Sequence, residues 1–280
     1  MNCIVMSANH FPDTPASNIS NKVLPVHPHV EYLKTVPQYE QRTAPWYERR
    51  KTLMTASNAA AALGIKPFAS FQGCPRREAI MQIVYGTFKG NVATRHGQKH
   101  EDWVRDRFDE IMGTKTEEYG LLVHSDVHGE GGLNWLGASP DGITHNGAMV
   151  EIKCPYRREI TDEVPHHYLP QCLVQMEVCD LPICYFVEWQ PAWLNKDGVE
   201  VFSIKTVERD PAWFEKNKPL LKSFYDELMY EREHYVPPPP PPKLIRDALY
   251  DDIKHAKASA TLAFLEDDDE EGGAMFLDDC

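Results

Sequence analysis

The sequence predicts an α/β domain with a mixed β-sheet flanked by helices. Helical and strand-like patterns alternate between Trp46 and Glu233, in the order helix, three strands, helix, two strands, helix. With 42% hydrophobic and 25% charged residues, the composition is that of an ordinary globular protein. A chain of 280 residues has room for one well-buried domain with tails, or at most two small domains.

Three helices are expected before the first strand. Residues 55–64, TASNAAAALG, indicate a short helix with Ser57 as N-cap and Gly64 at its C-terminal end. A second helix follows Pro75 in PRREAIMQIVYG. The third, TRHGQKHEDWVRDRFDEIMG, is long and amphipathic and should end at Gly113. Its apolar residues near one face are Trp103, Phe108 and Met112.

The remaining elements follow from short β-type runs and two further helical patterns. Alternation and β-branched or aromatic residues are typical of strands, and amphipathic periodicity is typical of helices. The expected strands are EEYGLLVHS, NWLGAS, AMVEIKC, ICYFVEW and VEVFSIKTVE. The expected helices are those near HHYLPQCLVQMEVCD and in PAWFEKNKPLLKSFYDELMYEREH.

Three regions are expected along the chain. Residues 1–41 are polar and without clear periodicity, which indicates a loosely ordered arm. Residues 42–236 form the domain, and residues 237–280 a linker and an acidic tail. Six consecutive prolines open this last region and predict a stiff polyproline II rod about 19 Å long. The tail is too acidic to bury a core, so disorder is expected; it either solubilises the chain or docks a partner.

The formal net charge of −13 is unevenly distributed. Residues 237–280 contain eleven acidic and four basic residues, whereas residues 42–107 contain twelve Lys and Arg against five acidic residues. Only the local balance bears on phosphate binding, so the acidic average does not exclude a nucleic-acid partner.

No secretory signal or membrane span is visible in the sequence. The N-terminus lacks a basic region followed by an apolar run, and no apolar run approaches eighteen residues. The seven cysteines include no Cys-x-x-Cys pair. Mostly reduced thiols and an intracellular location are therefore expected.

The stretch GASPDGITHNGAMVEIKCP contains the candidate catalytic residues. Asp141 lies in a Ser-Pro-Asp-Gly turn, where Asp is also common for local hydrogen bonding. Glu151 and Lys153 alternate with apolar residues and share one strand face; the competing interpretation is an edge strand with a solvated charged face. In a hairpin, Asp141 and Glu151 would lie side by side. Paired carboxylates favour Mg²⁺ or Mn²⁺, and a neighbouring lysine suits phosphodiester hydrolysis.

These residues resemble the signature of the PD-(D/E)XK nuclease superfamily: Asp141, then Glu151-Ile152-Lys153. The blocks ASPDG, EIKCP, YLPQCLVQMEV and WYERRKTLMTAS, in their order along the chain, resemble the lambda exonuclease family and its YqaJ-type viral recombinase nucleases, including those of large eukaryotic DNA viruses. The resemblance covers about residues 46–189. It implies a restriction-endonuclease-like core.

The resemblance also implies roles for the acidic centre. Asp141 and Glu151 would be metal ligands together with the Ile152 carbonyl, and Lys153 the catalytic lysine. Glu101 would hold or orient a second metal ion or its water; without the resemblance it is a solvated helix acid. One further residue matches on the helix after the core strands. Gln171 would lie beside the catalytic water, while Leu173 stands where the family often has a second glutamine, so Gln175 receives no role.

A second group would bind the 5′-phosphate of a DNA end. Trp46, Arg50 and Ser57 fit the family spacing, and Ser139 would assist. Arginine binds phosphate bidentately, and a helix N-terminus at Ser57 would attract an anion. The alternative for Ser57 is a plain N-cap, worth about 1 kcal/mol to its helix.

Two other kinds of metal site are less well supported. His96 and His100 share a helix face, but HGQKHE does not match a zinc hydrolase motif, and lining the DNA groove is the better interpretation. Cys154 and Cys172 lack the spacing of an iron–sulfur site.

The expected function is a Mg²⁺-dependent exonuclease, with Mn²⁺ as the alternative ion and two ions per site. It would degrade linear double-stranded DNA from the 5′ end and leave 3′ single strands for viral recombination or genome processing. The alternatives are a structure-selective endonuclease on the same core and a catalytically weak DNA-end-binding protein. By resemblance, expected partners are DNA ends, a single-strand annealing or single-strand-binding protein, and two further copies in a homotrimer.

Overall fold

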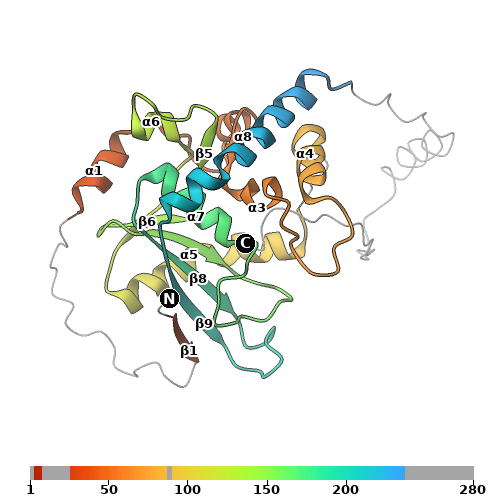
Figure 1. Cartoon of the computed structure of the whole chain (residues 1–280). Helices are drawn as coiled ribbons and strands as arrows, with labels where there is room; N and C mark the ends of the chain where they lie inside the picture. Colours follow the sequence, from red (N-terminus) through yellow and green to blue (C-terminus); the bar gives the residue numbers. More distant parts are fainter. Residues whose placement is uncertain (1–2, 8–25, 87–89, 237–280) are drawn as a thin grey trace, which may run out of the picture. The chain divides into compact units, whose positions relative to one another are not determined.

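The computed structural model describes residues 3–7, 26–86 and 90–236. The chain divides into two compact units, and nearly all of the second, His234–Gly273, lies outside the described residues, as does the expected linker and tail at 237–280. The first unit has the expected α/β architecture with mixed sheets (Figure 1). None of its described helices combines the length and apolar character of a membrane span.

A six-stranded sheet forms the centre of this unit. Its order is β1 (Cys3–Ser7), β9 (Val201–Glu208), β8 (Ile183–Gln190), β7 (Met149–Lys153), β6 (Gly142–Thr144) and β3 (Thr116–Glu117). Only β7 and β8 run parallel; the other neighbours are antiparallel. β7, which carries the predicted catalytic residues, is therefore an inner strand and not an edge strand.

A separate three-stranded sheet lies beside the central one. It has the order β2 (Met54–Thr55), β5 (Leu136–Ala138) and β4 (Leu122–Val123). The sequence predicts a single strand in each of the runs 117–125 and 134–139. Instead the first divides among β3, β4 and α6 (His124–His128), and the second enters the small sheet. The chain thus crosses from one sheet to the other at residues 139–141.

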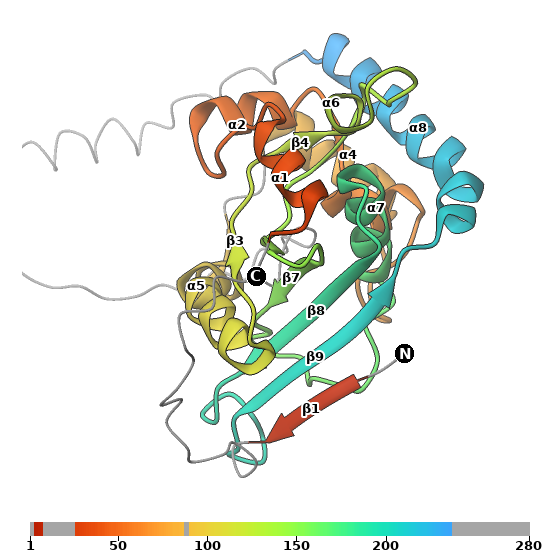
Figure 2. The same ribbon diagram turned by 90° about the vertical axis from the view of Figure 1, so that its left-hand side faces the viewer.

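Two helices cover opposite faces of the central sheet (Figure 2). On one face, Val104 and Phe108 of α5 (Val92–Met112) pack with Val150 and Ile152. On the other lies α7 (Leu169–Cys179), nearly all of whose residues are buried. Gly113 ends α5 in the left-handed conformation, as the sequence predicts, but Trp103 is 46% exposed and does not join the core face.

The remaining helices complete the core around α7. α8 (Pro211–Glu233) buries Phe214, Leu221, Phe224 and Leu228 against it and against two other helices. These are α3 (Ala59–Ala62) and α4 (Pro75–Tyr85). The expected helix at 55–64 is shorter than predicted: a 3₁₀ turn, η2 (Ala56–Asn58), precedes the four residues of α3. α2 (Ala44–Arg50) is a further short helix.

The prediction of a loosely ordered arm at 1–41 is wrong for part of that segment. α1 (Pro28–Thr35) fully buries Val30 and Leu33, and β1 pairs with β9. Two buried residues in one eight-residue helix give too short a periodicity to recognise in the sequence. The division into arm, domain and tail stays a prediction, and residues 8–25 lie outside the described residues.

Candidate active site

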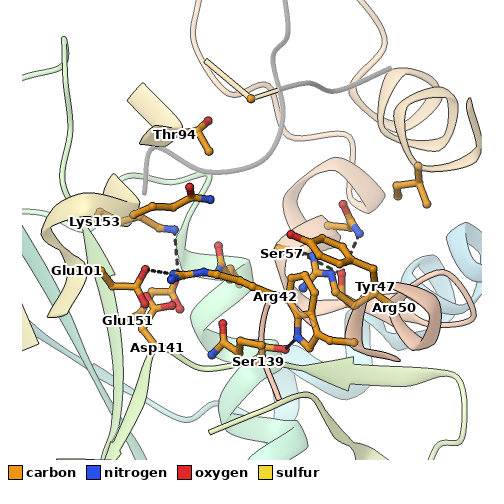
Figure 3. Close-up of a pocket in the computed structure, with 18 of the residues that line it drawn as sticks. Arg42, Tyr47, Arg50, Ser57, Thr94, Glu101, Ser139, Asp141, Glu151 and Lys153 are labelled. Atoms are coloured by element: carbon orange, nitrogen blue, oxygen red, sulfur yellow. Dashed lines mark hydrogen bonds and ion pairs between the residues drawn. The ribbon is translucent and has the colours of Figure 1, made fainter. Parts of the chain in front are cut away.

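One cavity of about 560 Å³ brings together all the predicted site side chains except that of Ile152 (Figure 3). Its lining comes from α2, the 55–58 turn, α5, the 139–141 crossing, β7 and α7. The predicted residues among them are Arg50, Ser57, Glu101, Ser139, Asp141, Glu151, Lys153 and Gln171.

Glu151 and Lys153 lie side by side on β7 and are almost completely buried. Glu151 is 1% exposed and Lys153 0%, and the Lys153 Nζ lies 3.0 Å from Glu151 Oε1. This burial excludes the alternative of a solvated charged face. A buried ammonium and carboxylate require partners, since an unpaired buried charge is strongly destabilising. The pair is therefore a fixed feature of the sheet face.

Two glutamines of α7 hold the Glu151 carboxylate. Gln171 Nε2 donates to Oε1 at 2.6 Å, and Gln175 Nε2 donates to Oε2 at 2.8 Å. Gln175, to which the resemblance assigns no role, thus contacts Oε2, whereas Gln171 and Lys153 contact Oε1. The spacing of four residues places both glutamines on one helix face, and this signal in the sequence identifies Gln175 once Gln171 is accepted as a site residue.

Asp141 lies immediately before β6 of the central sheet. β6 begins at Gly142, which pairs with Val150, so the backbone one residue earlier does not continue the ladder. Here Asp141 Oδ2 accepts a hydrogen bond from the Ile152 N–H at 2.7 Å. Burial raises the pKa of the Asp141 carboxyl well above its usual range, and the charges of Glu151 and Glu101 add to this. Lys153 and the Ile152 N–H act in the opposite direction.

Glu101 reaches the same region from α5. It is 4% exposed, which excludes the interpretation as a solvated helix acid. Arg42 Nη2 donates to its Oε2 at 2.6 Å, and Arg105 Nη2 lies 3.5 Å from its Oε1. Burial raises the pKa of the Glu101 carboxyl, and the two arginine charges hold that rise back. No motif in the sequence pointed to Arg42.

The predicted phosphate-binding residues converge on the other side of the cavity. Arg50 Nη2 donates to Ser57 Oγ at 3.2 Å, and the Arg50 guanidinium lies over the Trp46 ring at 4.3 Å. Trp46 Nε1 in turn donates to Ser139 Oγ at 3.0 Å. Arginine and hydroxyl donors directed at one space suit an anion such as phosphate.

The role of Ser57 as a helix N-cap is not observed. Ser57 lies inside η2, and its hydroxyl contacts Arg50 and Thr55 Oγ1 instead of a free backbone N–H. Because η2 and α3 are both very short, the expected anion-attracting helix N-terminus is absent at this position. Any phosphate binding here comes from side chains.

The donor set suits a hard divalent cation, but its geometry is not preformed. Asp141, Glu151 and Glu101 offer carboxylate oxygens, the ligands that Mg²⁺ and Mn²⁺ prefer. Within the described residues, however, no three Asp, Glu, His or Cys side chains are arranged to hold a metal ion. All three carboxylates are already bound by protein donors. Cation binding therefore requires some of these contacts to change.

His96 and His100 belong to an aromatic cluster. Their ring centroids are 4.7 Å apart, and both rings lie against Trp189, while His96 also contacts Tyr156 and Trp193. Burial lowers the pKa of both imidazoles. The five cysteines with described side chains are free thiols, as expected from the sequence.

Comparison with known proteins identifies the family. Residues 45–182 match the model of the YqaJ-like viral recombinase domain. An uncharacterized protein of Acanthamoeba polyphaga mimivirus is 27% identical over 182 residues, which cover 57% of this chain and 31% of that protein. A protein of African swine fever virus is 26% identical over 174 residues, covering 51% and 46%. The chain thus spans 31% and 46% of the length of these two curated relatives.

The fold matches that of a solved nuclease. An alkaline exonuclease from Laribacter hongkongensis superposes with a TM-score of 0.53 and 24% identity, covering 78% of this chain and 100% of that one. A second structure of that enzyme is a complex with dAMP and gives the same values. The architecture is therefore the PD-(D/E)XK fold of alkaline exonucleases, as the sequence predicts. Residues 45–182, just under half of the chain, thus correspond to a YqaJ-like viral recombinase domain.

Proposed function

We propose that this protein is a divalent-cation-dependent exonuclease that degrades one strand of linear double-stranded DNA from its 5′ end. The observation that carries the proposal is that one cavity joins the buried acidic centre to the Arg50–Ser57 pair. An anchored terminal phosphate places the next phosphodiester at a fixed distance, toward the acidic centre. Fixed placement of this kind accelerates a reaction and selects chain ends at the same time.

The acidic centre supplies the hydrolytic half of the mechanism. Asp141, Glu151 and Glu101, with the Ile152 carbonyl, are the proposed ligands of Mg²⁺ or Mn²⁺, two ions per site. Bound there, such ions would activate a water molecule at neutral pH and would neutralise charge on the phosphate. The Lys153 ammonium, 3.0 Å from Glu151, adds positive charge facing the pentacovalent transition state. Gln171 and Gln175 fix the orientation of the Glu151 carboxylate.

The phosphate side determines which substrates enter. Arg50 and Ser57, with Ser139 assisting, are the proposed 5′-phosphate ligands. The exonuclease that shares this fold has been solved with dAMP, a deoxynucleoside monophosphate, which supports a site of this type. The product would be a 3′ single strand for viral recombination or genome processing. A homotrimer, a single-strand annealing partner and a host cytoplasmic or nuclear location are proposals that rest on the family resemblance.

The test compares linear duplexes with 5′-phosphate and 5′-hydroxyl ends, each in Mg²⁺ and in Mn²⁺, together with a closed circular duplex. We expect mononucleotide release from the phosphorylated end, slower release from the hydroxyl end and no cleavage of the circle. Equal rates on the two ends would remove the phosphate anchor. Cleavage of the circle would indicate the structure-selective endonuclease, and binding of ends without any cleavage would indicate an end-binding protein.

A further inference from the structure

Arg42 is a cation inside the acidic half of the cavity, and the proposed mechanism leaves it without a role. Its guanidinium donates to Glu101 Oε2 at 2.6 Å. The two partners are unequally exposed: the Glu101 side chain is 5% exposed and that of Arg42 is 45%. Figure 3 shows Arg42 extending across the cavity toward Glu101. Arg42 therefore covers Glu101 from the open side of the site.

The backbone of Arg42 is held in an unfavourable conformation. Arg42 and Asp180 are the only non-glycine residues with positive φ in the described part of the chain, at 64° and 53°. Asp180 is the C-cap of α7, where the left-handed conformation is common. Arg42 ends no helix, and its left-handed backbone costs free energy in an L-residue. Persistent strain of this kind indicates a functional constraint when the surroundings enforce it.

The flanking residues enforce this conformation. Gln41 Nε2 donates to the Tyr119 carbonyl at 2.8 Å and to the Pro140 carbonyl at 3.0 Å. Upstream, Tyr39 forms a β-bridge with Leu121, and Gly120 permits the close approach, since a Cβ there would lie 2.3 Å from the Tyr39 oxygen. The turn that carries Arg42 is thus attached to the crossing that carries Asp141.

The Arg42 contact conflicts with cation binding at Glu101. A guanidinium and a divalent ion cannot both occupy the side of Oε2 that faces the cavity, and they also repel one another. Arg105, 13% exposed, approaches the other oxygen from α5 and can stay in place. Of the groups that hold Glu101, Arg42 is therefore the one free to move into the cavity.

We propose that Arg42 is an exchangeable counter-ion of Glu101. A divalent cation displaces its guanidinium from Oε2, and the released guanidinium then binds a non-bridging phosphate oxygen of the DNA strand in the cavity. Guanidinium groups bind carboxylate and phosphate with the same planar pair of donors, so the exchange replaces one charge-assisted contact with another. The second step rests on the proposed nuclease function; the first does not.

The first step is tested with Mn²⁺ alone, without DNA. The affinity of the protein for Mn²⁺ is measured by calorimetry and by the electron paramagnetic resonance signal of the free ion. Arg42→Gln removes the competing cation, and we expect Mn²⁺ to bind about three- to tenfold more tightly. Arg42→Gly should show the same gain, and because glycine accepts the left-handed conformation, this variant guards against a folding defect.

The matched control is Arg95→Gln, which removes the same charge from the same cavity at a residue without a contact to Glu101 in this structure. Its Mn²⁺ affinity should change less than about twofold. Unchanged or weaker Mn²⁺ binding in both Arg42 variants would overturn the exchange. An equal gain in Arg95→Gln would also overturn it, because the effect would then be a general response to lost positive charge.

The second step is tested by DNA cleavage at saturating Mn²⁺. We expect Arg42→Gln to raise KM for linear duplex DNA about tenfold, as expected for the loss of a charged phosphate contact. An unchanged KM and kcat would remove the phosphate contact and leave the Mn²⁺ result intact. If the wild-type protein does not cleave DNA, the proposed function fails, while the Mn²⁺ titration still decides the exchange.

Discussion

The two halves of the cavity differ in their burial and in the elements that support them. In the acidic half, Glu151 and Lys153 lie on an inner strand of the central sheet and are almost fully buried. In the phosphate half, Arg50, Ser57 and Ser139 are half-buried and lie on a short helix, a 3₁₀ turn and a crossing loop. The core of the protein fixes the acidic half. Hydrogen bonds and a cation–π contact nearer the surface hold the phosphate half.

We infer from this difference that the acidic half carries out the chemistry and that the phosphate half recognises the substrate. Burial raises the pKa values of Asp141 and Glu101, and the charges of Glu151 and Glu101 add to the rise at Asp141, so the acidic half costs folding free energy that cation binding offsets. In the phosphate half, the hydroxyls and the guanidinium contact one another and Trp46. We therefore expect substitutions in the acidic half to affect rate and stability, and those in the phosphate half to affect the choice of substrate.

The largest effect is expected at Lys153. Lys153→Ala removes the proposed catalytic ammonium, and the rate of DNA cleavage should fall by about 10³-fold or more. DNA binding, measured by fluorescence anisotropy, should persist because the phosphate half is unchanged. Lys51→Ala serves as the control, since Lys51 lines the same cavity but is exposed and paired with Glu48. A modest loss in both variants would mean that chemistry does not depend on the buried half.

Arg50 tests the other half. Arg50→Gln should slow cleavage of a 5′-phosphorylated duplex about 10- to 100-fold and leave the 5′-hydroxyl duplex unaffected, because only the former uses the guanidinium. The neighbouring Arg49→Gln is the matched control: Arg49 contacts Thr52 and does not line the cavity. Equal slowing on both ends would show that Arg50 acts on rate and that the two halves are not separate.

A smaller effect is expected at Gln175. Gln175→Met keeps the side-chain volume but removes the donor to Glu151 Oε2, so kcat should fall about tenfold with KM for DNA unchanged. Gln171→Met, which removes the donor to Oε1, gives the scale for comparison. A change in KM alone would place Gln175 in substrate binding instead of in the orientation of Glu151.

The smallest effect is a gain in stability at Asp141. Since the pKa of this carboxyl is raised in the folded protein, folding favours the protonated form, and its contribution to stability is lost as pH rises above 3.8. Asp141→Asn should therefore raise Tm at neutral pH when a chelator removes divalent ions. Near pH 4 the gain should disappear.

Asp109→Asn is the control for this measurement. Asp109 accepts hydrogen bonds from the Thr116 N–H and hydroxyl, so its charge is used by the fold, and the substitution should lower Tm. A fall in Tm for Asp141→Asn as well would contradict the view that the buried charge of Asp141 destabilises the folded protein.

The sequence alone predicted most of the elements and the side chains that line the cavity. Amphipathic periodicity and glycine at the end predicted α5, and alternation predicted β7 with Glu151 and Lys153 on one face. These features are local: each depends on residues a few positions apart, so the chain itself displays them. The predicted site residues came from one short motif and from the family resemblance, and all of their side chains except that of Ile152 line one cavity.

The tertiary structure decided those features that depend on contacts between residues far apart in the sequence. Alternation does not distinguish an inner strand from an edge strand, so the sequence does not show that Glu151 and Lys153 are buried. Their burial follows from the position of β7 between β8 and β6. The crossing at 139–141 carries both Ser139 and Asp141 because Leu136–Ala138 pairs in one sheet and Gly142–Thr144 in another. Arg42 meets Glu101 across 59 positions of sequence. Pairings over such distances are selected by the packing of the whole domain, and no local pattern encodes them.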